Sequence, residues 1–320
     1  MRVLILVFIF SLMKPCFASL PPALKIWPLG DSITYGSFGT NGGYRGLLFY
    51  FLTNSANTFV FVGSSTANGG ITILPVNQRT NEGHESFACN NILTNLDGFD
   101  NSLFLQYGGA SRDPNGGRWL TGTNSRPALF PDVILLLIGA NERDNTSGAQ
   151  GRLDNLVSKL VTMRPTAHLI IARITPITDS ISHSNFVVTY NQGVDTVVAK
   201  YAVSNRVTKV DLFNGFPTNG FSTDKLHPND IGYTWMAGNW YSAIFAAYGA
   251  QLTAGSGSYS NNMFRIGGNG GPSNILTIQA TTNFLQWTNI GTATGDVNGN
   301  FNFTDINTSS LPRRFYRAKN

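Results

Sequence analysis

The sequence Lys-Ile-Trp-Pro-Leu-Gly-Asp-Ser-Ile, residues 25–33, joins a short apolar run to a turn of small and polar residues. Lys25–Leu29 has the length and composition of a buried strand, and Gly30-Asp31-Ser32 follows directly at its carboxyl end. In open parallel sheets, ligands bind beyond the carboxyl ends of the strands. The stretch therefore indicates a parallel α/β sheet and also marks the edge where its functional site is expected.

The same pattern of apolar runs and amphipathic stretches continues to about residue 249. The further runs expected as strands are Phe59–Val62, Val133–Ile138, His168–Ile174 and Val207–Leu212. The stretches expected as helices are Gly43–Asn54, Phe87–Leu96, Gly148–Met163, Val187–Ser204 and Ile231–Tyr248. Strands alternating with helices predict an α/β fold, a three-layer α/β/α sandwich with a five-stranded parallel sheet.

After Gly249 the composition changes to Gly, Ser, Asn and Thr, and Gly255-Ser256-Gly257-Ser258 is typical of a flexible linker. The strand-like runs beyond it are Ile275–Ile278, Phe284–Trp287, Phe301–Phe303 and Phe315–Arg317. We predict a main domain over residues 19–250, a linker over 251–272 and a small all-β module over 273–320.

The first 18 residues have the features of an export signal. Arg2 gives a positive start, Val3–Met13 is apolar, and small residues precede the expected cleavage after Ala18. A membrane anchor is the alternative, but the run stops at Lys14, short of the roughly 20 apolar residues that span a bilayer. We expect a secreted protein, extracellular or periplasmic, whose mature chain has no membrane span.

Composition narrows the class of protein. Only 12% of the 320 residues are charged, and the net charge of +5 is spread without a Lys/Arg run, so a nucleic-acid partner is not expected. Of the two cysteines, Cys16 lies in the predicted signal, which leaves Cys89 without an intrachain partner. A nucleophilic Cys89 is one interpretation, and a small core residue is the favoured one.

Three strand-end motifs carry groups that act together in ester chemistry. A serine hydroxyl needs a base, and His227 in Asp224-Lys225-Leu226-His227 supplies an imidazole with a carboxylate three residues earlier to orient it. The Asn141 amide, after the strand ending at Ile138, is able to donate to an oxyanion. Ser32, His227, Asp224 and Asn141 are therefore the candidate reactive groups.

These motifs make residues 26–249 similar to the SGNH hydrolases, also called the GDSL esterase/lipase superfamily. The matching blocks are Gly30-Asp31-Ser32-Ile33, Gly139-Ala140-Asn141-Glu142 and Asp224-Lys225-Leu226-His227-Pro228. The resemblance implies a flavodoxin-like sheet, a nucleophilic Ser32, a base in His227 and an orienting acid in Asp224. It also implies an oxyanion hole formed by the N–H groups of Ser32 and Ser86 and the amide of Asn141.

The chain departs from the family pattern at two positions. Glu142 stands where the family has Asp, which should leave Asn141 intact and change the hydrogen bonding of its loop. Ser86 stands where Glu-Gly-His-Ser-Gly-Trp of the carbohydrate acetylesterases has a glycine. Its N–H is retained if serine adopts the required backbone dihedral.

We also expect Pro228 to occupy the first turn of the closing helix.

Within the superfamily, these blocks look like those of acetylxylan-esterase-type carbohydrate esterases, which implies O-deacetylation of an acetylated polysaccharide. The candidate substrate-binding residues are Asp31, His84, Tyr44 and Trp119. The irregular insertion Asp97–Pro131 is either a lid or a surface excursion, and both interpretations stay open.

Two alternatives compete with this function. One is a short-chain aryl, lipolytic or polyester-type esterase with the same reactive residues and a more apolar acyl pocket. The other is a non-catalytic glycan-binding protein. Whether Asp224 is essential, or Ser32 and His227 suffice as a dyad, also stays open. Neither a metal nor a cofactor is expected, because the sequence has no Cys/His cluster, phosphate loop or complete dinucleotide motif.

The C-terminal module resembles extensions of secreted bacterial proteins that end in Phe-Tyr-Arg-Ala, here Phe315–Ala318. Glycan binding, retention at the cell surface and export sorting are all compatible with such a module. The sequence does not choose among them.

Overall fold

The structure is a computed structural model. It describes residues 24–53, 59–69, 73–99, 117–202, 206–248, 257–260, 263–270, 273–281, 288–306 and 314–319. The predicted signal peptide and the predicted strand Phe284–Trp287 lie outside these residues, as does part of the insertion. The chain forms two compact units. The main unit comprises Leu24–Leu52 and Phe59–Ala243, and the C-terminal unit includes Ile244–Asn320.

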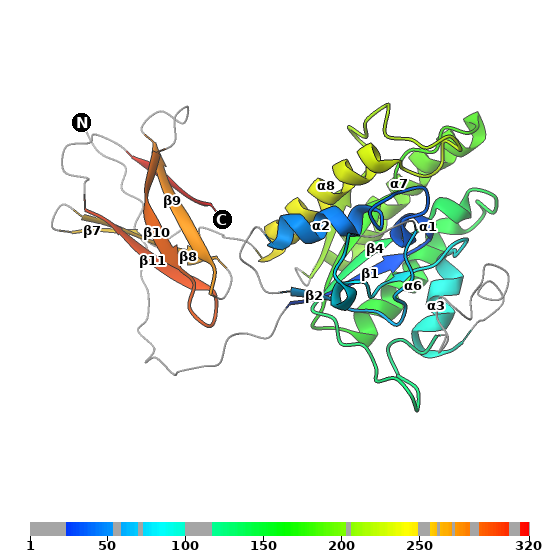
Figure 1. Cartoon of the computed structure of the whole chain (residues 1–320), viewed down its shortest axis with the longest axis horizontal. Helices are drawn as coiled ribbons and strands as arrows, with labels where there is room; N and C mark the ends of the chain where they lie inside the picture. The colour runs from blue at the N-terminus through cyan, green and yellow to red at the C-terminus, as the bar shows by residue number, and fades with distance from the viewer. Residues whose placement is uncertain are drawn as a thin grey trace. The chain divides into compact units, whose positions relative to one another are not determined.

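A parallel sheet forms the centre of the main unit (Figure 1). Its main strands are β1 (Leu24–Gly30), β2 (Phe59–Phe61), β4 (Val133–Leu137), β5 (His168–Arg173) and β6 (Val207–Asp211). They lie in the order β2-β1-β4-β5-β6, which confirms the predicted five-stranded sheet with flavodoxin-like order.

The sheet also has a short strand that the sequence did not predict. This strand, β3 (Glu82–Gly83), pairs in parallel with the carboxyl end of β1. It has only two residues and no apolar run, so periodicity gave no signal for it. Gly30 is aligned with Gly83 on one side and with Leu137 of β4 on the other. This register brings the segments that follow β1, β3 and β4 to one edge of the sheet.

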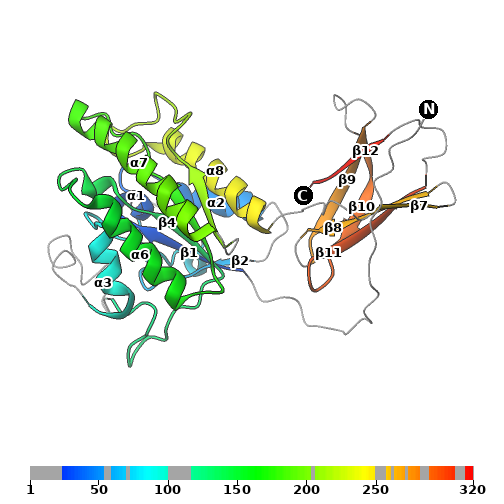
Figure 2. The same cartoon turned by 180° about the vertical axis from the view of Figure 1, so that it is seen from behind.

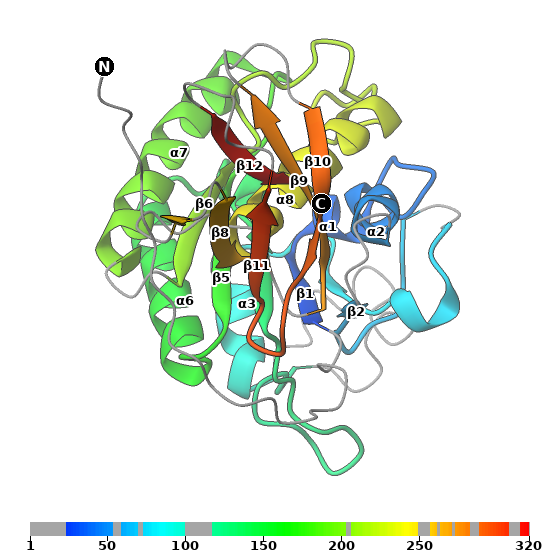
Figure 3. The ribbon, with the colours of Figure 1, turned by 90° about the vertical axis from the view of Figure 1, so that its left-hand side faces the viewer.

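Helices cover both faces of the sheet and complete the predicted three layers. The bounds are α1 (Ser32–Tyr35), α2 (Tyr44–Thr53), α3 (Cys89–Asp97), α6 (Ala149–Met163), α7 (Ile181–Tyr201) and α8 (Asp230–Tyr248). Two 3₁₀ turns are also present, η1 (Val76–Gln78) between β2 and β3 and η2 (Ala140–Glu142) between β4 and α6. α3, α6 and α7 lie on one face, which Figure 2 shows from its own side, and α2 and α8 lie on the other (Figures 1 and 3). None of the helices in the described residues is long and apolar enough to cross a membrane.

Helix capping explains why α7 and α8 begin at other residues than the sequence predicts. α7 begins before the expected Val187, because the hydroxyl of Ser180 accepts a hydrogen bond from the backbone N–H of His183. The prediction that Pro228 occupies the first turn of α8 is wrong, because that helix begins at Asp230. Asn229 caps that helix instead, and its side-chain oxygen accepts from the N–H groups of Ile231 and Gly232 at 2.9 and 3.2 Å.

The buried strands form the core of the main unit. Every residue of β4 is buried, and Ile26, Trp27 and Leu29 of β1 have no exposed surface. On the face of the sheet that α2 and α8 cover, the ring centroid of Tyr44 in α2 lies 5.8 Å from that of Trp240 in α8. Burial of aromatic and branched side chains on both faces fixes the sheet and its strand ends in place.

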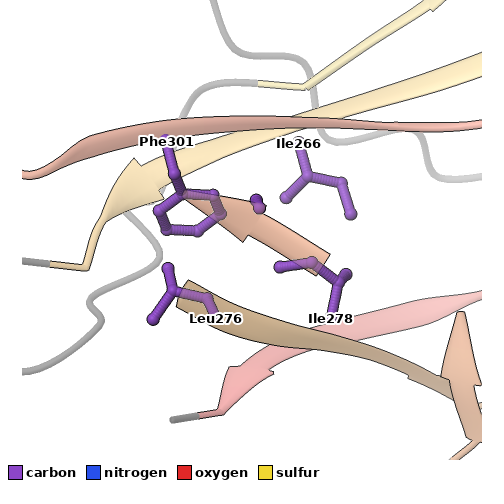
Figure 4. Packing of buried hydrophobic residues seen from close by; sticks show 5 residues of the cluster. Ile266, Leu276, Ile278 and Phe301 are labelled. Carbon is purple, nitrogen blue, oxygen red and sulfur yellow. The ribbon is translucent and has the colours of Figure 1, made fainter. Parts of the chain in front are cut away.

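The C-terminal unit contains two three-stranded antiparallel sheets, in the orders β10-β9-β12 and β11-β8-β7. Their strands are β7 (Gly257–Ser260), β8 (Met263–Asn269), β9 (Ile275–Thr281), β10 (Thr288–Thr294), β11 (Asn300–Asp305) and β12 (Phe315–Lys319). The core between them consists of Ile266, Leu276, Ile278, Ala293 and Phe301 (Figure 4).

The predicted linker 251–272 needs correction, because β7 and β8 lie within it. The Gly- and Ser-rich composition suggested a flexible segment, but Ile266 is buried in the module core and β8 pairs with β11 from Phe264 to Asn269. Backbone pairing over that length outweighs the weak strand propensity of glycine and serine.

Candidate active site

Ser32 is the first residue of α1 and is separated from the end of β1 by Asp31 alone. Asp31 caps this helix, and its side chain accepts from the N–H of Ile33 at 3.0 Å. Gly30 is needed for the close approach of β1 to β4, because a Cβ atom there would lie 2.0 Å from the carbonyl oxygen of Leu137. The result is a rigid strand-to-helix turn that carries a largely buried Ser32.

The structure brings Ser32, His227 and Asp224 into one hydrogen-bonded chain. Ser32 Oγ lies 2.7 Å from His227 Nε2, and His227 Nδ1 lies 2.6 Å from Asp224 Oδ2. These side chains come from opposite ends of the main unit's sequence, and both contacts are partly shielded from water. The geometry allows a proton to pass from the serine hydroxyl to the imidazole.

A local turn places Asp224 and His227 face to face. Lys225 has a φ of 56°, in the left-handed region, and turns the chain back on itself between them. Asp224 Oδ1 accepts from the N–H groups of Leu226 and His227, both at 3.0 Å, and from Ser222 Oγ at 2.5 Å. The Asp224 carboxylate is therefore held on one oxygen while the other faces the imidazole.

These contacts set the charge of Asp224. Partial burial acts to raise the pKa of this carboxyl, but the hydrogen bonds from Ser222, from the His227 ring and from two backbone N–H groups outweigh it and lower the pKa to about 2. An ionised carboxylate only accepts hydrogen bonds, so His227 Nδ1 carries the proton. Nε2 is then free to accept the proton of Ser32.

The two further predicted oxyanion donors lie in adjacent segments. Asn141 is in η2, after β4, and its Nδ2 donates to the carbonyl oxygen of Phe87 at 2.9 Å. This bond connects it to the segment that carries Ser86, and the amide has a second N–H for another acceptor. Ser86 has a φ of 65°, so serine here adopts a conformation in which glycine is less strained.

Glu142, the other departure from the family pattern, uses its longer side chain to connect neighbouring elements. It is 1% exposed, and its Oε1 accepts from the N–H of Cys89 at 2.9 Å. Its Oε2 accepts from Arg152 Nε at 2.7 Å. Glu142 thus ties η2 to α3 and α6 and fixes the turn next to Asn141. The partner Arg152 carried no sequence signal.

The candidate substrate-binding residues lie inside the protein, which corrects that expectation. Tyr44 and Trp119 have no exposed surface, and His84 is 2% exposed. The His84 and Trp119 rings stack 5.3 Å apart with an angle of 4° between their planes. His84 Nε2 also lies 2.8 Å from Glu82. These rings pack the core and offer no face to a sugar.

Asp31 is also fully buried and serves as a helix cap. Burial raises its pKa to about 7, against the opposing effects of backbone groups of Ile33 and Ala140 and the charge of Arg143. It therefore offers no accessible carboxylate to a substrate.

Two residues near the reactive groups have roles that the sequence did not predict. The fully buried guanidinium of Arg45 donates to the carbonyl oxygens of Thr34 and Tyr35 at 2.9 and 3.1 Å, and so holds the end of α1. Phe38 stacks on the ring of His227, with ring centroids 5.0 Å apart. Arg45 lies in the block Gly42-Gly43-Tyr44-Arg45 and Phe38 in no motif, but the contacts that give both residues these roles form only in the folded chain.

Cys89 is a core residue, as favoured from the sequence. It is fully buried at the start of α3, and its sulfur lies 3.5 Å from the hydroxyl of Tyr190. Burial raises the pKa of this thiol well above its usual range, which disfavours the reactive thiolate. In the part of the chain that the structure describes, no three His, Cys, Asp or Glu side chains are grouped to hold a metal ion.

Comparison with known proteins identifies relatives of the main unit. The sequence profile of the GDSL-like Lipase/Acylhydrolase family matches residues 61–235. This range contains Asn141, Asp224 and His227 and begins after Ser32.

The chain is 30% identical over 244 residues to a multidomain esterase of Ruminococcus flavefaciens, and this match covers 72% of the chain and 29% of the relative. It is 29% identical over 113 residues to a putative endoglucanase X of Acetivibrio thermocellus, which covers 35% of the chain and 49% of that protein. The chain thus spans less than half the length of either curated relative.

Solved structures give similar results. A family 3 carbohydrate esterase of Clostridium thermocellum is 26% identical with a TM-score of 0.50, and the match covers 70% of this chain and 97% of that one. A family 3 carbohydrate esterase from Talaromyces cellulolyticus, at 18% identity and a TM-score of 0.52 over the same shares, supports the fold alone.

Proposed function

Because the chain belongs to the GDSL-like lipase/acylhydrolase family, we propose that it is a secreted serine esterase that removes acetyl groups from a xylan-like polysaccharide. The observation that carries the proposal is the continuous chain of hydrogen bonds from Ser32 through His227 to Asp224. It has the geometry that a nucleophile, a general base and an orienting acid require.

The reaction proceeds through an acyl-enzyme. Ser32 Oγ attacks the ester carbonyl carbon while its proton moves to His227 Nε2, and the Asp224 carboxylate stabilises the resulting imidazolium. The N–H groups of Ser32 and Ser86 and the Asn141 amide donate to the oxyanion. When the intermediate collapses, the C–O bond to the sugar breaks and His227 protonates the departing oxygen.

Hydrolysis of the acyl-enzyme uses the same groups. A water molecule gives a proton to His227 and attacks the acetyl carbon, and a second oxyanion forms in the same place. Its collapse breaks the bond to Ser32, whose oxygen takes the proton back from His227, and acetate leaves. The enzyme is then unchanged, and each cycle consumes one water and one ester.

Two observations support a sugar ester as the substrate. The solved structure that is 26% identical to this chain is a carbohydrate esterase by name. The chain also has few charges, which suits a neutral polysaccharide. A lipolytic, aryl or polyester-type hydrolase with the same reactive residues is the second candidate, and the family description, which covers both lipases and acylhydrolases, favours keeping it.

Hydrolysis of nitrophenyl esters from acetate to octanoate, measured beside acetate release from acetylated xylan, separates these functions. A sharp preference for acetate together with release from xylan supports the proposal, and an optimum at butyrate or longer without xylan activity supports the second candidate.

The Ser32→Ala variant tests the reactive residues. It should remain folded and lose turnover on every ester. Retained turnover would refute the assignment of Ser32, and glycan binding by an inactive wild-type protein would point to a binding protein.

A further inference from the structure

Phe38 is an exposed aromatic residue in direct contact with the reactive imidazole. Its ring stacks on that of His227, with centroids 5.0 Å apart and 23° between the planes. The residue nevertheless remains 59% exposed. Since the imidazole covers one face of the ring, the exposed surface lies on the opposite face and along the edges.

The segment around Phe38 is held in place by hydrogen bonds. The hydroxyl of Tyr233 donates to the carbonyl oxygen of Ser37 at 2.8 Å. Two residues after Phe38, the backbone N–H and the hydroxyl of Thr40 donate to Asp230 at 2.8 and 2.6 Å. The backbone on both sides of Phe38 is therefore held in place before any substrate binds, which reduces the entropy lost on binding.

Packing does not explain why a phenylalanine occupies this position. Phe38 has a φ of 63°, in the left-handed region, where bulky side chains are strained and glycine or asparagine is preferred. Its exposed ring buries little apolar surface in return. Strain that a fold retains without a gain in packing is typical of residues that serve a site.

The position of Phe38 relative to His227 indicates what the ring would contact. In the mechanism proposed above, Nε2 returns its proton to the oxygen of the leaving alcohol, so that oxygen must lie within hydrogen-bond distance of the imidazole. The Phe38 and imidazole ring centroids are only 5.0 Å apart, so a leaving group larger than a few atoms has the exposed part of the Phe38 ring as a neighbouring surface. A pyranose ring carries C–H groups on its faces, which pack well on a flat aromatic surface.

We propose that Phe38 is the leaving-group platform of this esterase, and that the exposed surface of its ring packs against the C–H groups of the sugar whose acetyl ester is cleaved. This inference rests on the proposed function. It assigns the recognition of the sugar to a residue that the sequence motifs do not include, in place of the buried Tyr44 and Trp119.

The test compares two acetate esters that differ only in the leaving group, acetylated xylo-oligosaccharides and ethyl acetate. The variants are F38A, which removes the ring, and F38L, which keeps apolar bulk against His227 without a flat face. F38W restores an aromatic face. F130A is the matched control, because Phe130 is 64% exposed and lies 4.3 Å from the guanidinium of Arg164.

We expect F38A and F38L to lower kcat/KM for the sugar ester by about tenfold or more, mainly through KM, and to change that for ethyl acetate by less than about threefold. F38W should retain most of the activity on the sugar ester. F130A should leave both substrates unchanged.

The inference is overturned if F38A lowers kcat/KM equally for the sugar ester and for ethyl acetate, because Phe38 would then act only through His227. A shift of the pH profile for ethyl acetate would overturn it for the same reason. It is also overturned if F38A leaves kcat/KM unchanged for both substrates. A wild-type protein that hydrolyses no acetate ester refutes the proposed function itself. The two failures are thus distinguished, one by the wild type and one by the ratio of the variants.

Discussion

Replacement of Asp224 by Asn tests whether the orienting carboxylate is essential. Asn has the same shape as Asp, so its oxygen still accepts from the N–H groups of Leu226 and His227. Its amide nitrogen, however, replaces the oxygen that lies 2.6 Å from His227 Nδ1. Two N–H donors do not face each other at this distance, so the imidazole changes tautomer and places a proton on Nε2.

The size of the expected fall in kcat follows from this change of tautomer. With Nε2 already protonated, His227 is unable to accept the proton of Ser32, although Nε2 and Ser32 Oγ lie 2.7 Å apart in the structure. We expect kcat to fall by about 10³- to 10⁴-fold, as in other serine hydrolases with this substitution, which is about 4–5 kcal/mol in the activation free energy.

The assay is the turnover of nitrophenyl acetate by the folded variant. Circular dichroism and thermal unfolding establish that D224N remains folded. S222A is the matched control, because it removes the hydrogen bond to Oδ1 and leaves the Oδ2 contact with the imidazole. Loss of one such bond is worth about 1 kcal/mol, so kcat of S222A should fall by only about fivefold.

A D224N protein that is folded and keeps more than about a tenth of the wild-type kcat would refute this reasoning. Ser32 and His227 would then act as a dyad, and the role of Asp224 would be limited to the hydrogen bonds that shape its turn.

Four further predictions concern the same site and its support. S86G should raise the free energy of unfolding by up to about 1 kcal/mol, since it relieves the positive φ, and should keep kcat within about threefold; a lower melting temperature would contradict this. E142Q should lower the free energy of unfolding by about 3 kcal/mol in urea titrations, because it leaves Arg152 without its buried carboxylate, and a loss under about 1 kcal/mol would show that the pair is dispensable. The pKa of Asp224 is lowered from 3.8 to about 2 on folding. Its contribution to the free energy of unfolding, about 2 kcal/mol, is therefore present above about pH 4 and lost as the pH falls toward about 2. Acid unfolding of D224N should lack this part of the pH dependence, and an unchanged pH dependence would contradict the lowered pKa. The thiol of Cys89 should react with a thiol reagent only after unfolding, and fast labelling of the native protein would contradict its burial and raised pKa.

The local sequence determined the framework of the site. Apolar runs of strand length followed by Gly30-Asp31-Ser32 and by Gly139-Ala140-Asn141 specify strand ends that carry polar groups, because a strand and its terminal turn depend on neighbouring residues. The spacing from Asp224 to His227 is also local, and the turn at Lys225 closes it into a hydrogen bond. For these reasons the sheet was correctly predicted, and Ser32, His227 and Asp224 lie in hydrogen-bond contact with one another.

Only the tertiary structure decided which aromatic side chains are available to a substrate. Trp119 and Phe38 are equally apolar in the sequence, yet one is enclosed by His84 and the other lies exposed on His227. The pairing of Glu142 with Arg152 depends likewise on segments that meet after folding. Burial and long-range contacts depend on how the layers pack against one another, and no local pattern of residues encodes that packing.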